Sequence, residues 1–206
     1  MKTTILSALP LLGAALALPQ SVTPTSTAPT TTITASAGAT VGPLGLLSIR
    51  SGSDIQYAEI NAADSHFYIG KPTHTYCPNE PNIPCASLGN QTYVEVFGTG
   101  EMSLTAIVPG GQQVYIGPKG ALRFTEPHSS LMPKGSTQGG FTVTDEGAFY
   151  EVSHEGGFLA CPVHEKKGGA PYQIFVGVEG FERTDCEGFD LAGVEVKDAA
   201  PAWEYE

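Results

Sequence analysis

The chain has 206 residues, of which 41% are hydrophobic and only 15% are charged, and its formal net charge is −11. A typical globular domain is about a quarter charged. An acidic chain lacks the positive field that holds phosphate backbones, so we expect no nucleic-acid partner. The length suits one domain with an appendage.

The N-terminus has the three parts of a secretory signal peptide. Met1-Lys2 is a positive start, an apolar run follows over residues 5–16, and Ala15-Leu16-Ala17 has the small residues of a cleavage site. The run is too short for a membrane anchor, which needs about 20 apolar residues. We therefore predict a signal peptide at residues 1–17, secretion, and no membrane association after cleavage.

Residues 18–42 form a second region of different composition. Between residues 21 and 40, eleven of the 20 residues are Ser or Thr, and none is charged. Such a segment has little apolar surface to bury, so it is predicted to be a disordered stalk. In a secreted chain this composition is typical of an O-glycosylated stalk, and a plain flexible linker is the alternative.

From residue 43 to 206 the pattern is uniform and predicts a single all-β domain. Short runs of β-branched and aromatic residues alternate with turns such as Pro109-Gly110-Gly111, and no stretch has helical periodicity over three turns. Strands are expected near residues 44–49, 55–60, 67–69, 93–97, 102–108, 113–116, 122–125, 141–144, 148–152, 158–160, 173–178 and 191–196. Many short strands with regular turns indicate an antiparallel β-sandwich or a small barrel.

Four cysteines lie in the predicted domain: Cys77, Cys85, Cys161 and Cys186. An even number in a secreted chain favours disulfides, and three pairings are open. The rigid segment from Cys77 to Cys85 closes on itself easily, so we favour Cys77–Cys85 together with Cys161–Cys186. The spacing does not fit a zinc site. Asn90-Gln91-Thr92 is the only N-glycosylation sequon of the chain, and we predict that Asn90 is modified.

The sequence contains no recognised catalytic motif: no nucleophile elbow, zinc-protease motif, P-loop or dinucleotide fingerprint. The histidines are scattered and are expected on surfaces or loops: His66, His74, His128, His154 and His164. From residue 145 to 206 there are 14 acids against four bases, a net of −10. This acidity is typical of a solvated face that keeps a secreted protein soluble. We expect no enzymatic activity, no cofactor and no metal.

Several ordered segments resemble one known family: residues 50–56, 76–78, 109–115, 120–125, 128–129, 158–162, 172–175 and 202–205. Over residues 44–206 the chain is similar to the fungal PhiA-like (phialide) cell-wall proteins, often labelled IgE-binding proteins. The resemblance implies a secreted, all-β, non-enzymatic protein of the fungal wall or extracellular space, without catalytic residues to carry over. A fainter similarity, at residues 140–147, Cys161, Tyr172 and residues 186–191, is to the C-terminal domain of Pir-type wall mannoproteins. The glutamine-containing repeats of Pir proteins are absent from this sequence.

These observations predict a secreted cell-wall or surface glycoprotein, a structural or interaction module that acts by binding. Its partners would be wall polysaccharides or wall glycoproteins, contacted through glycans and polar loops such as residues 109–113, and we expect a monomer. The alternative is a secreted glycan- or host-binding module, with a concave site lined by aromatic residues such as Tyr57, Tyr68, Tyr115 or Phe124. A third class, a carbohydrate-active hydrolase, would require a cleft with two carboxylates about 5–10 Å apart.

Overall fold

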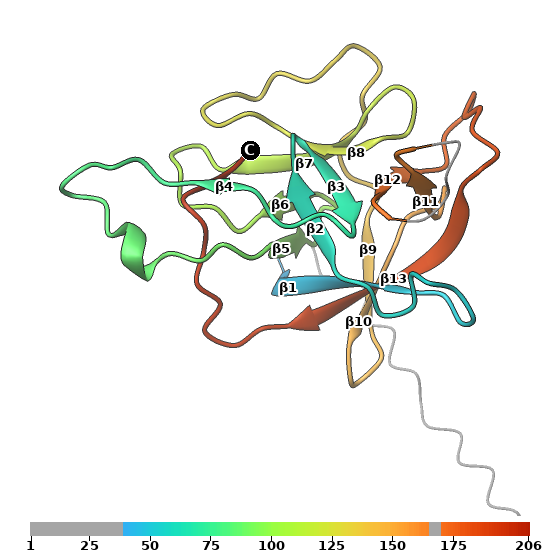
Figure 1. Cartoon of the computed structure of the whole chain (residues 1–206), viewed down its shortest axis with the longest axis horizontal. Helices are drawn as coiled ribbons and strands as arrows, with labels where there is room; N and C mark the ends of the chain where they lie inside the picture. Colours follow the sequence, from blue (N-terminus) through green and yellow to red (C-terminus); the bar gives the residue numbers. More distant parts are fainter. Residues whose placement is uncertain (1–38, 165–169) are drawn as a thin grey trace, which may run out of the picture.

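The computed structural model describes residues 39–164 and 170–206. The predicted signal peptide (1–17) and most of the predicted stalk (18–42) lie outside this part of the chain. Within it, strands supply nearly all of the regular structure (Figure 1), and the one helical element is a 3-10 helix, η1 (Cys85–Ser87). None of the described residues forms a helix with the length and apolarity to cross a membrane. The all-β class predicted from the sequence is confirmed.

The strands are short and mostly separated by tight turns or loops. In chain order they are β1 (Thr40–Ile49), β2 (Ile60–Ala63), β3 (His66–Ile69), β4 (Thr75–Tyr76), β5 (Val94–Phe97), β6 (Met102–Leu104), β7 (Gln112–Ile116), β8 (Leu122–Phe124), β9 (Thr142–Asp145), β10 (Tyr150–Ser153), β11 (Phe158–Pro162), β12 (Tyr172–Val176), β13 (Glu187–Glu195) and β14 (Glu204–Tyr205). Strand β1 starts before the predicted domain boundary, because Thr40 already pairs with Phe97 of β5. Residues 40–42 of the predicted stalk therefore belong to the folded domain.

The main sheet closes on itself as a barrel. Neighbouring strands follow the order β1-β5-β6-β7-β8-β3-β12-β11-β13, and β13 pairs again with β1, from Leu44↔Glu195 to Ile49↔Asp190. Strand β2 lies beside β3, and the β9–β10 hairpin extends from β13. The strand pairs are antiparallel. Closure leaves few free sheet edges, and it selects the barrel from the two predicted architectures.

Side chains fill the barrel interior, because alternate residues of each strand point inward. In β5 and β6 the buried residues are every second one, Val94 and Val96 in the first strand and Met102 and Leu104 in the second. Aromatic rings pack at one point of this core, where Phe124 stands edge-on to both Phe67 and Tyr205 at centroid distances of 5.7 and 6.4 Å. The penultimate residue of the chain is thus part of the core.

The strand predicted at residues 55–60 is wrong over most of its length. Residues 51–57 form a series of turns, and the strand β2 begins only at Ile60. Local hydrogen bonds hold the turns: the amide of Tyr57 donates to the carbonyl of Ser48 (2.8 Å), and Tyr57 has a positive φ of 59°. The apolar Ile55 that suggested a strand is buried from within the turn.

The strand predicted at residues 102–108 is shorter in the structure, because its second half pairs with the C-terminal segment. Strand β6 ends at Leu104, and the amides of Ile107 and Val108 donate instead to the carbonyls of Ala202 and Trp203. The short β14 then pairs with β4 in a separate two-stranded sheet. Figure 1 shows the chain end beside β4. The strands β4 and β14, with two residues each, were not predicted from the sequence.

Candidate functional site

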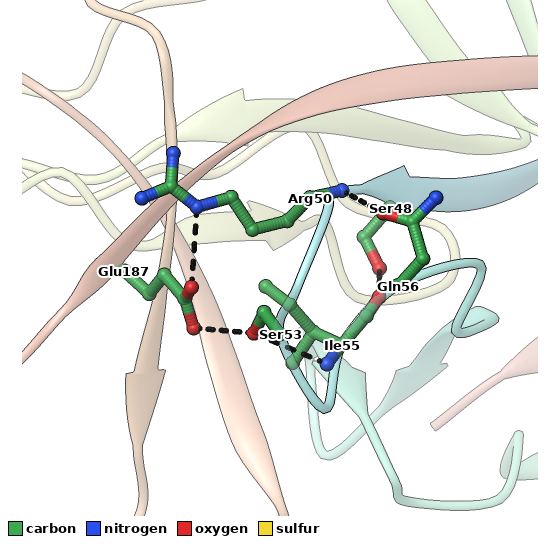
Figure 2. A network of polar contacts seen from close by, with 6 residues as sticks. All are labelled: Ser48, Arg50, Ser53, Ile55, Gln56 and Glu187. Carbon is green, nitrogen blue, oxygen red and sulfur yellow. Dashed lines mark hydrogen bonds and ion pairs between the residues drawn. The ribbon is translucent and has the colours of Figure 1, made fainter.

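A loop after β1 is tied to the start of β13 through a polar network, shown in Figure 2. The Nε atom of Arg50 lies 3.2 Å from one carboxylate oxygen of Glu187, and the hydroxyl of Ser53 donates to the other oxygen at 2.7 Å. Residues far apart in the sequence are therefore joined at one surface. The side chain of Arg50 is 52% exposed, so its ion pair contributes less than about 1 kcal/mol to stability.

Backbone and side-chain contacts within the loop fix its shape. The amide of Arg50 donates to the side-chain oxygen of Gln56 at 2.6 Å. The buried hydroxyl of Ser48 donates to the carbonyl of Ile55 and also lies 3.2 Å from that of Ala58. A loop that is bonded at its start, middle and end has little freedom to rearrange. The Arg50 side chain therefore projects from a rigid base.

A pocket of about 480 Å³ lies beside this loop. It is lined by Ile49, Arg50, Ser51, Gly156, Gly157, Phe158, Leu159, Gly188, Phe189 and Asp190. We call it the Arg50 pocket. Its volume is within the range of small-ligand sites, about 300–1,000 Å³.

One glycine of the Arg50 pocket, Gly156, is required by backbone packing. A Cβ atom on Gly156 would lie 1.9 Å from the carbonyl oxygen of Gly177, which is closer than any real contact. The loop between β10 and β11 therefore approaches the chain after β12 backbone to backbone. This close approach leaves main-chain groups, rather than side chains, along that wall of the pocket.

Two charged groups of opposite sign line the Arg50 pocket. Figure 2 shows the terminal nitrogens of Arg50 pointing away from Ser53 and the loop. Among the described residues, the hydrogen bond of the Arg50 side chain is the one that its Nε atom donates to Glu187. Asp190 is exposed on β13. A guanidinium supplies up to five N–H donors and a carboxylate only acceptors. The pocket can therefore hydrogen-bond a ligand that carries hydroxyl groups.

The aromatic residues proposed from the sequence as a binding surface do not form one. Tyr68, Tyr115 and Phe124 are 9%, 3% and 2% exposed, whereas Tyr57 is 68% exposed. The Nζ atom of Lys71 lies 4.6 Å from the centroid of the Tyr68 ring. The prediction of an aromatic binding site built from these four residues is therefore wrong, since three of them are buried.

The polar loop at residues 109–113 was predicted to contact partners, but one of its residues, Gln112, points into the protein. Gln112 is fully buried. Its amide nitrogen donates to the carbonyls of Thr125 and Tyr205 at 3.1 and 2.8 Å, and its side-chain oxygen accepts the amide of Tyr205 at 2.7 Å. Gln112 thus holds the C-terminal strand, whereas Gln113 is exposed and contacts Gln138.

The sequon lies beside the same C-terminal strand. Asn90 is exposed, and Thr92 is 4% exposed. The hydroxyl of Tyr205 donates to the carbonyl of Gln91 at 2.8 Å. Burial raises the pKa of the Tyr205 phenol to about 12.

A second pocket of about 340 Å³ is lined by Gln91, Thr92 and Tyr93, together with residues of β1, β2 and β13.

The cysteines form the two disulfides favoured from the sequence. Cys77–Cys85 closes a short loop with a Cα–Cα distance of 5.9 Å, next to β4. Cys161–Cys186 joins β11 to the segment before β13 with a Cα–Cα distance of 4.2 Å. Both cross-links restrict the unfolded chain and so favour the folded state.

Three of the histidines have partners in the structure. His66 bonds the carbonyl of Asp64, and burial lowers its pKa. Burial also lowers the pKa of His154, whose Nδ1 accepts the amide of Gly156. His74 forms an exposed ion pair with Glu206 at 3.7 Å. Among the described residues, no group of three or more His, Cys, Asp or Glu could hold a metal ion.

Sequence reasoning identified residues 50–56 only as a segment shared with a family, and it missed the partners of Arg50. Glu187 appeared in the sequence as one of many acids. Its contact with Arg50 spans 137 positions, so no local pattern could have indicated it.

The closed antiparallel barrel and its two disulfides define a small β-module of the extracellular type. Over residues 44–206 the chain matches the family model described as "PhiA-like secreted protein", and it belongs to that family. A protein of Arthroderma benhamiae, printed as "Uncharacterized secreted protein", is 35% identical over 161 residues, which cover 71% of this chain and 76% of that protein. No solved structure matches the chain. The family and the relative are both described as secreted, in agreement with the predicted signal peptide.

Proposed function

We propose that the protein is a secreted, non-enzymatic component of the fungal cell wall or its surface, which acts as a structural and interaction module. Membership of a secreted fungal family supports the extracellular location. The barrel supports a structural role, because its closed sheet, two disulfides and the buried Tyr205 tie distant segments of the described chain together. The expected state in solution is a monomer, and the expected partners include no nucleic acid.

The contact with wall polysaccharide takes place at the Arg50 pocket. The single observation that carries this assignment is an exposed guanidinium on a rigid loop beside an exposed carboxylate, Asp190, with glycine backbone along the pocket wall. Sugar hydroxyls both donate and accept hydrogen bonds, so they match a site with Arg donors and Asp acceptors.

The character of the pocket favours binding over hydrolysis. A glycoside hydrolase uses a pair of carboxylates that face each other across the scissile bond. Asp190 is the one carboxylate that lines the described pocket. The nearby Glu187 already accepts hydrogen bonds from Arg50 and Ser53. Both carboxylate oxygens of Glu187 are therefore occupied by contacts within the fold.

The first experiment locates the protein. Culture medium and cell wall are separated, and the wall is extracted in turn with hot detergent, reducing agent and glucanase. We expect the protein in at least one wall fraction. Protein found only in the medium would overturn the wall assignment and leave a secreted glycan- or host-binding module.

The second experiment tests the pocket with purified protein and two insoluble probes, β-1,3-glucan and chitin. Co-sedimentation with at least one probe is expected for the wild type, and Arg50→Ala should reduce it about tenfold, which corresponds to the loss of one charge-assisted contact. Arg50→Lys keeps the charge without the planar fork and should fall between the two. Lys119→Ala is the matched control, since it removes one exposed positive charge outside the pocket. Equal binding by all variants would remove the pocket from the proposal.

A parallel assay measures reducing ends released from soluble β-glucan and chitin oligomers. No release above the background of heat-denatured protein is expected. Release that disappears in Asp190→Asn would contradict the non-enzymatic role directly.

A further inference from the structure

The C-terminal segment of the described chain contacts the backbone around the sequon Asn90-Gln91-Thr92. Before the sequon, the amide of Gly89 donates to the carbonyl of Pro201 at 2.9 Å. A Cβ atom on Gly89 would lie only 2.2 Å from the carbonyl oxygen of Ala200, so the two backbones are in direct contact. After Asn90, the carbonyl of Gln91 accepts the hydroxyl of Tyr205. The C-terminal segment therefore touches the chain on both sides of Asn90.

The hydroxyl of Thr92 is not free in the folded protein. It accepts the amide of Ala62 at 2.8 Å and shares a second hydrogen bond of 2.8 Å with the hydroxyl of Thr73. The residue is 4% exposed. N-glycosylation requires a Ser or Thr hydroxyl two residues after the asparagine. The folded sequon thus exposes its acceptor asparagine and buries the hydroxyl that the transfer reaction needs.

Tyr205 joins the C-terminal segment to the backbone of the sequon. Its side chain is fully buried, and its ring packs edge-on against Phe124. Its backbone is held by both ends of the Gln112 side-chain amide. The hydroxyl also lies 3.4 Å from the amide of Tyr93, so it contacts the residues on either side of Thr92. Removing Tyr205 from its site takes away one contact to the sequon backbone on each side of that threonine.

We propose that Asn90 is N-glycosylated before the C-terminal segment docks, and that docking of Tyr205 closes the sequon to further modification. In the transfer step the amide nitrogen of Asn90 forms a bond to the anomeric carbon of a lipid-pyrophosphate-linked oligosaccharide. The bond from that carbon to the pyrophosphate oxygen breaks, the lipid pyrophosphate leaves, and the amide loses a proton. The exposed position of Asn90 lets the finished glycan extend into solvent after the chain has closed.

The order of synthesis supplies the time for this step. Tyr205 follows Gln91 by 114 residues and is the penultimate residue. At synthesis rates of about 5–20 residues per second, the sequon precedes its cover by roughly 6 to 23 s. During that interval the Tyr205 and Pro201 contacts do not yet exist. The acceptor segment therefore remains without this cover until Tyr205 has been synthesised.

The experiment compares folded and unfolded acceptor in the same reaction. The mature chain is made in the bacterial periplasm, where disulfides form and no glycan is added. It is incubated with purified oligosaccharyltransferase and a lipid-pyrophosphate-linked oligosaccharide, and Asn90 occupancy is followed by intact mass. We expect negligible transfer to the folded wild type and ready transfer to the reduced and unfolded wild type. Asn90→Gln should accept nothing in either state.

A matched pair of variants tests the role of Tyr205 in the folded protein. Tyr205→Phe removes only the hydroxyl that contacts Gln91 and Tyr93, and it should raise the transfer rate roughly tenfold, as the loss of one or two hydrogen bonds raises the open population. Tyr172→Phe is the control, since this half-buried tyrosine of β12 lies outside the C-terminal contact. It should leave the rate unchanged.

Three results would overturn the proposal. Transfer to the folded wild type at the rate of the unfolded chain would show that folding does not close the sequon. No transfer to the unfolded chain would show that Asn90 is not an acceptor. Equal rates for Tyr205→Phe and Tyr172→Phe would show that Tyr205 is not the closing residue. The inference depends on secretion and not on wall binding, so the wall fractionation and the sugar-binding assay do not decide it.

Discussion

Replacing Tyr205 by Phe removes one hydroxyl from the protein interior and leaves the ring in place. The wild-type hydroxyl donates to the carbonyl of Gln91 at 2.8 Å and lies 3.4 Å from the amide of Tyr93. Leaving a buried donor or acceptor without its partner costs about 1–3 kcal/mol. Gln91 is exposed, so water can replace part of the lost contact. We expect Tyr205→Phe to lower the free energy of unfolding by about 1–2 kcal/mol at pH 7.

The same substitution changes how stability depends on alkaline pH. Burial raises the pKa of the Tyr205 phenol from 10.0 to about 12. Because the folded pKa is above the unfolded one, the neutral hydroxyl stabilises the fold fully below pH 10, and this stabilisation is lost as the pH rises towards 12. The full shift corresponds to about 3 kcal/mol, of which about half is lost by pH 11. The Phe variant has no group to titrate at this position.

The assay is urea unfolding of both proteins at pH 7, 9, 10 and 11, with disulfides intact. All four cysteines are paired, so no thiol is present to exchange. The stability difference between wild type and Tyr205→Phe should be constant to about pH 9.5 and then shrink by roughly 1–2 kcal/mol at pH 11. A difference that stays constant to pH 11 would refute the inference that the Tyr205 hydroxyl is desolvated.

Two further substitutions test the packing of the barrel. Gly156→Ala places a Cβ atom 1.9 Å from the carbonyl oxygen of Gly177 and should cost about 3 kcal/mol or more. Gly147→Ala, at a turn with φ of 82° and no atom within 4 Å, should cost only about 1 kcal/mol of backbone strain, and equal costs in urea unfolding would contradict the close approach. Replacing Cys161 and Cys186 together by Ser opens a loop of 25 residues and should cost about 3.5 kcal/mol. In a domain of this size that lowers Tm by roughly 7–14 °C, and a fall below about 3 °C in calorimetry would show that the unfolded chain is hardly restricted by this bond.

Much of the fold could be predicted because strand formation leaves a local pattern. The alternation in residues 102–104 predicts the buried and half-buried positions that β6 shows. The even number of cysteines and the rigid loop from Cys77 to Cys85 also favour the pairing that the structure contains. The strand predicted at residues 55–60 does not form over most of its length. The hydroxyl of Ser48 donates to the carbonyl of Ile55, and the side-chain oxygen of Gln56 accepts the amide of Arg50. These turn contacts outweigh the local preference for an extended chain.

The candidate site could not be predicted in this way. Arg50 meets Glu187 across 137 positions, and Gln112 meets Tyr205 across 93. Neither pair has a spacing that any secondary structure repeats. The aromatic residues Tyr68, Tyr115 and Phe124 were candidates for a binding surface from composition alone, and their burial depends on the face of the barrel that each strand turns inward.

The sequence by itself determined the acidic, secreted character of the chain, its all-β class and the sequon at Asn90, because composition, signal-peptide pattern and period-two alternation are properties of neighbouring residues. Only the tertiary structure decided that the sheet closes into a barrel, that Arg50 projects beside a pocket and that Tyr205 covers the sequon. Each of these depends on contacts between distant segments, and they form when burial of the shared core outweighs the entropy of bringing those segments together.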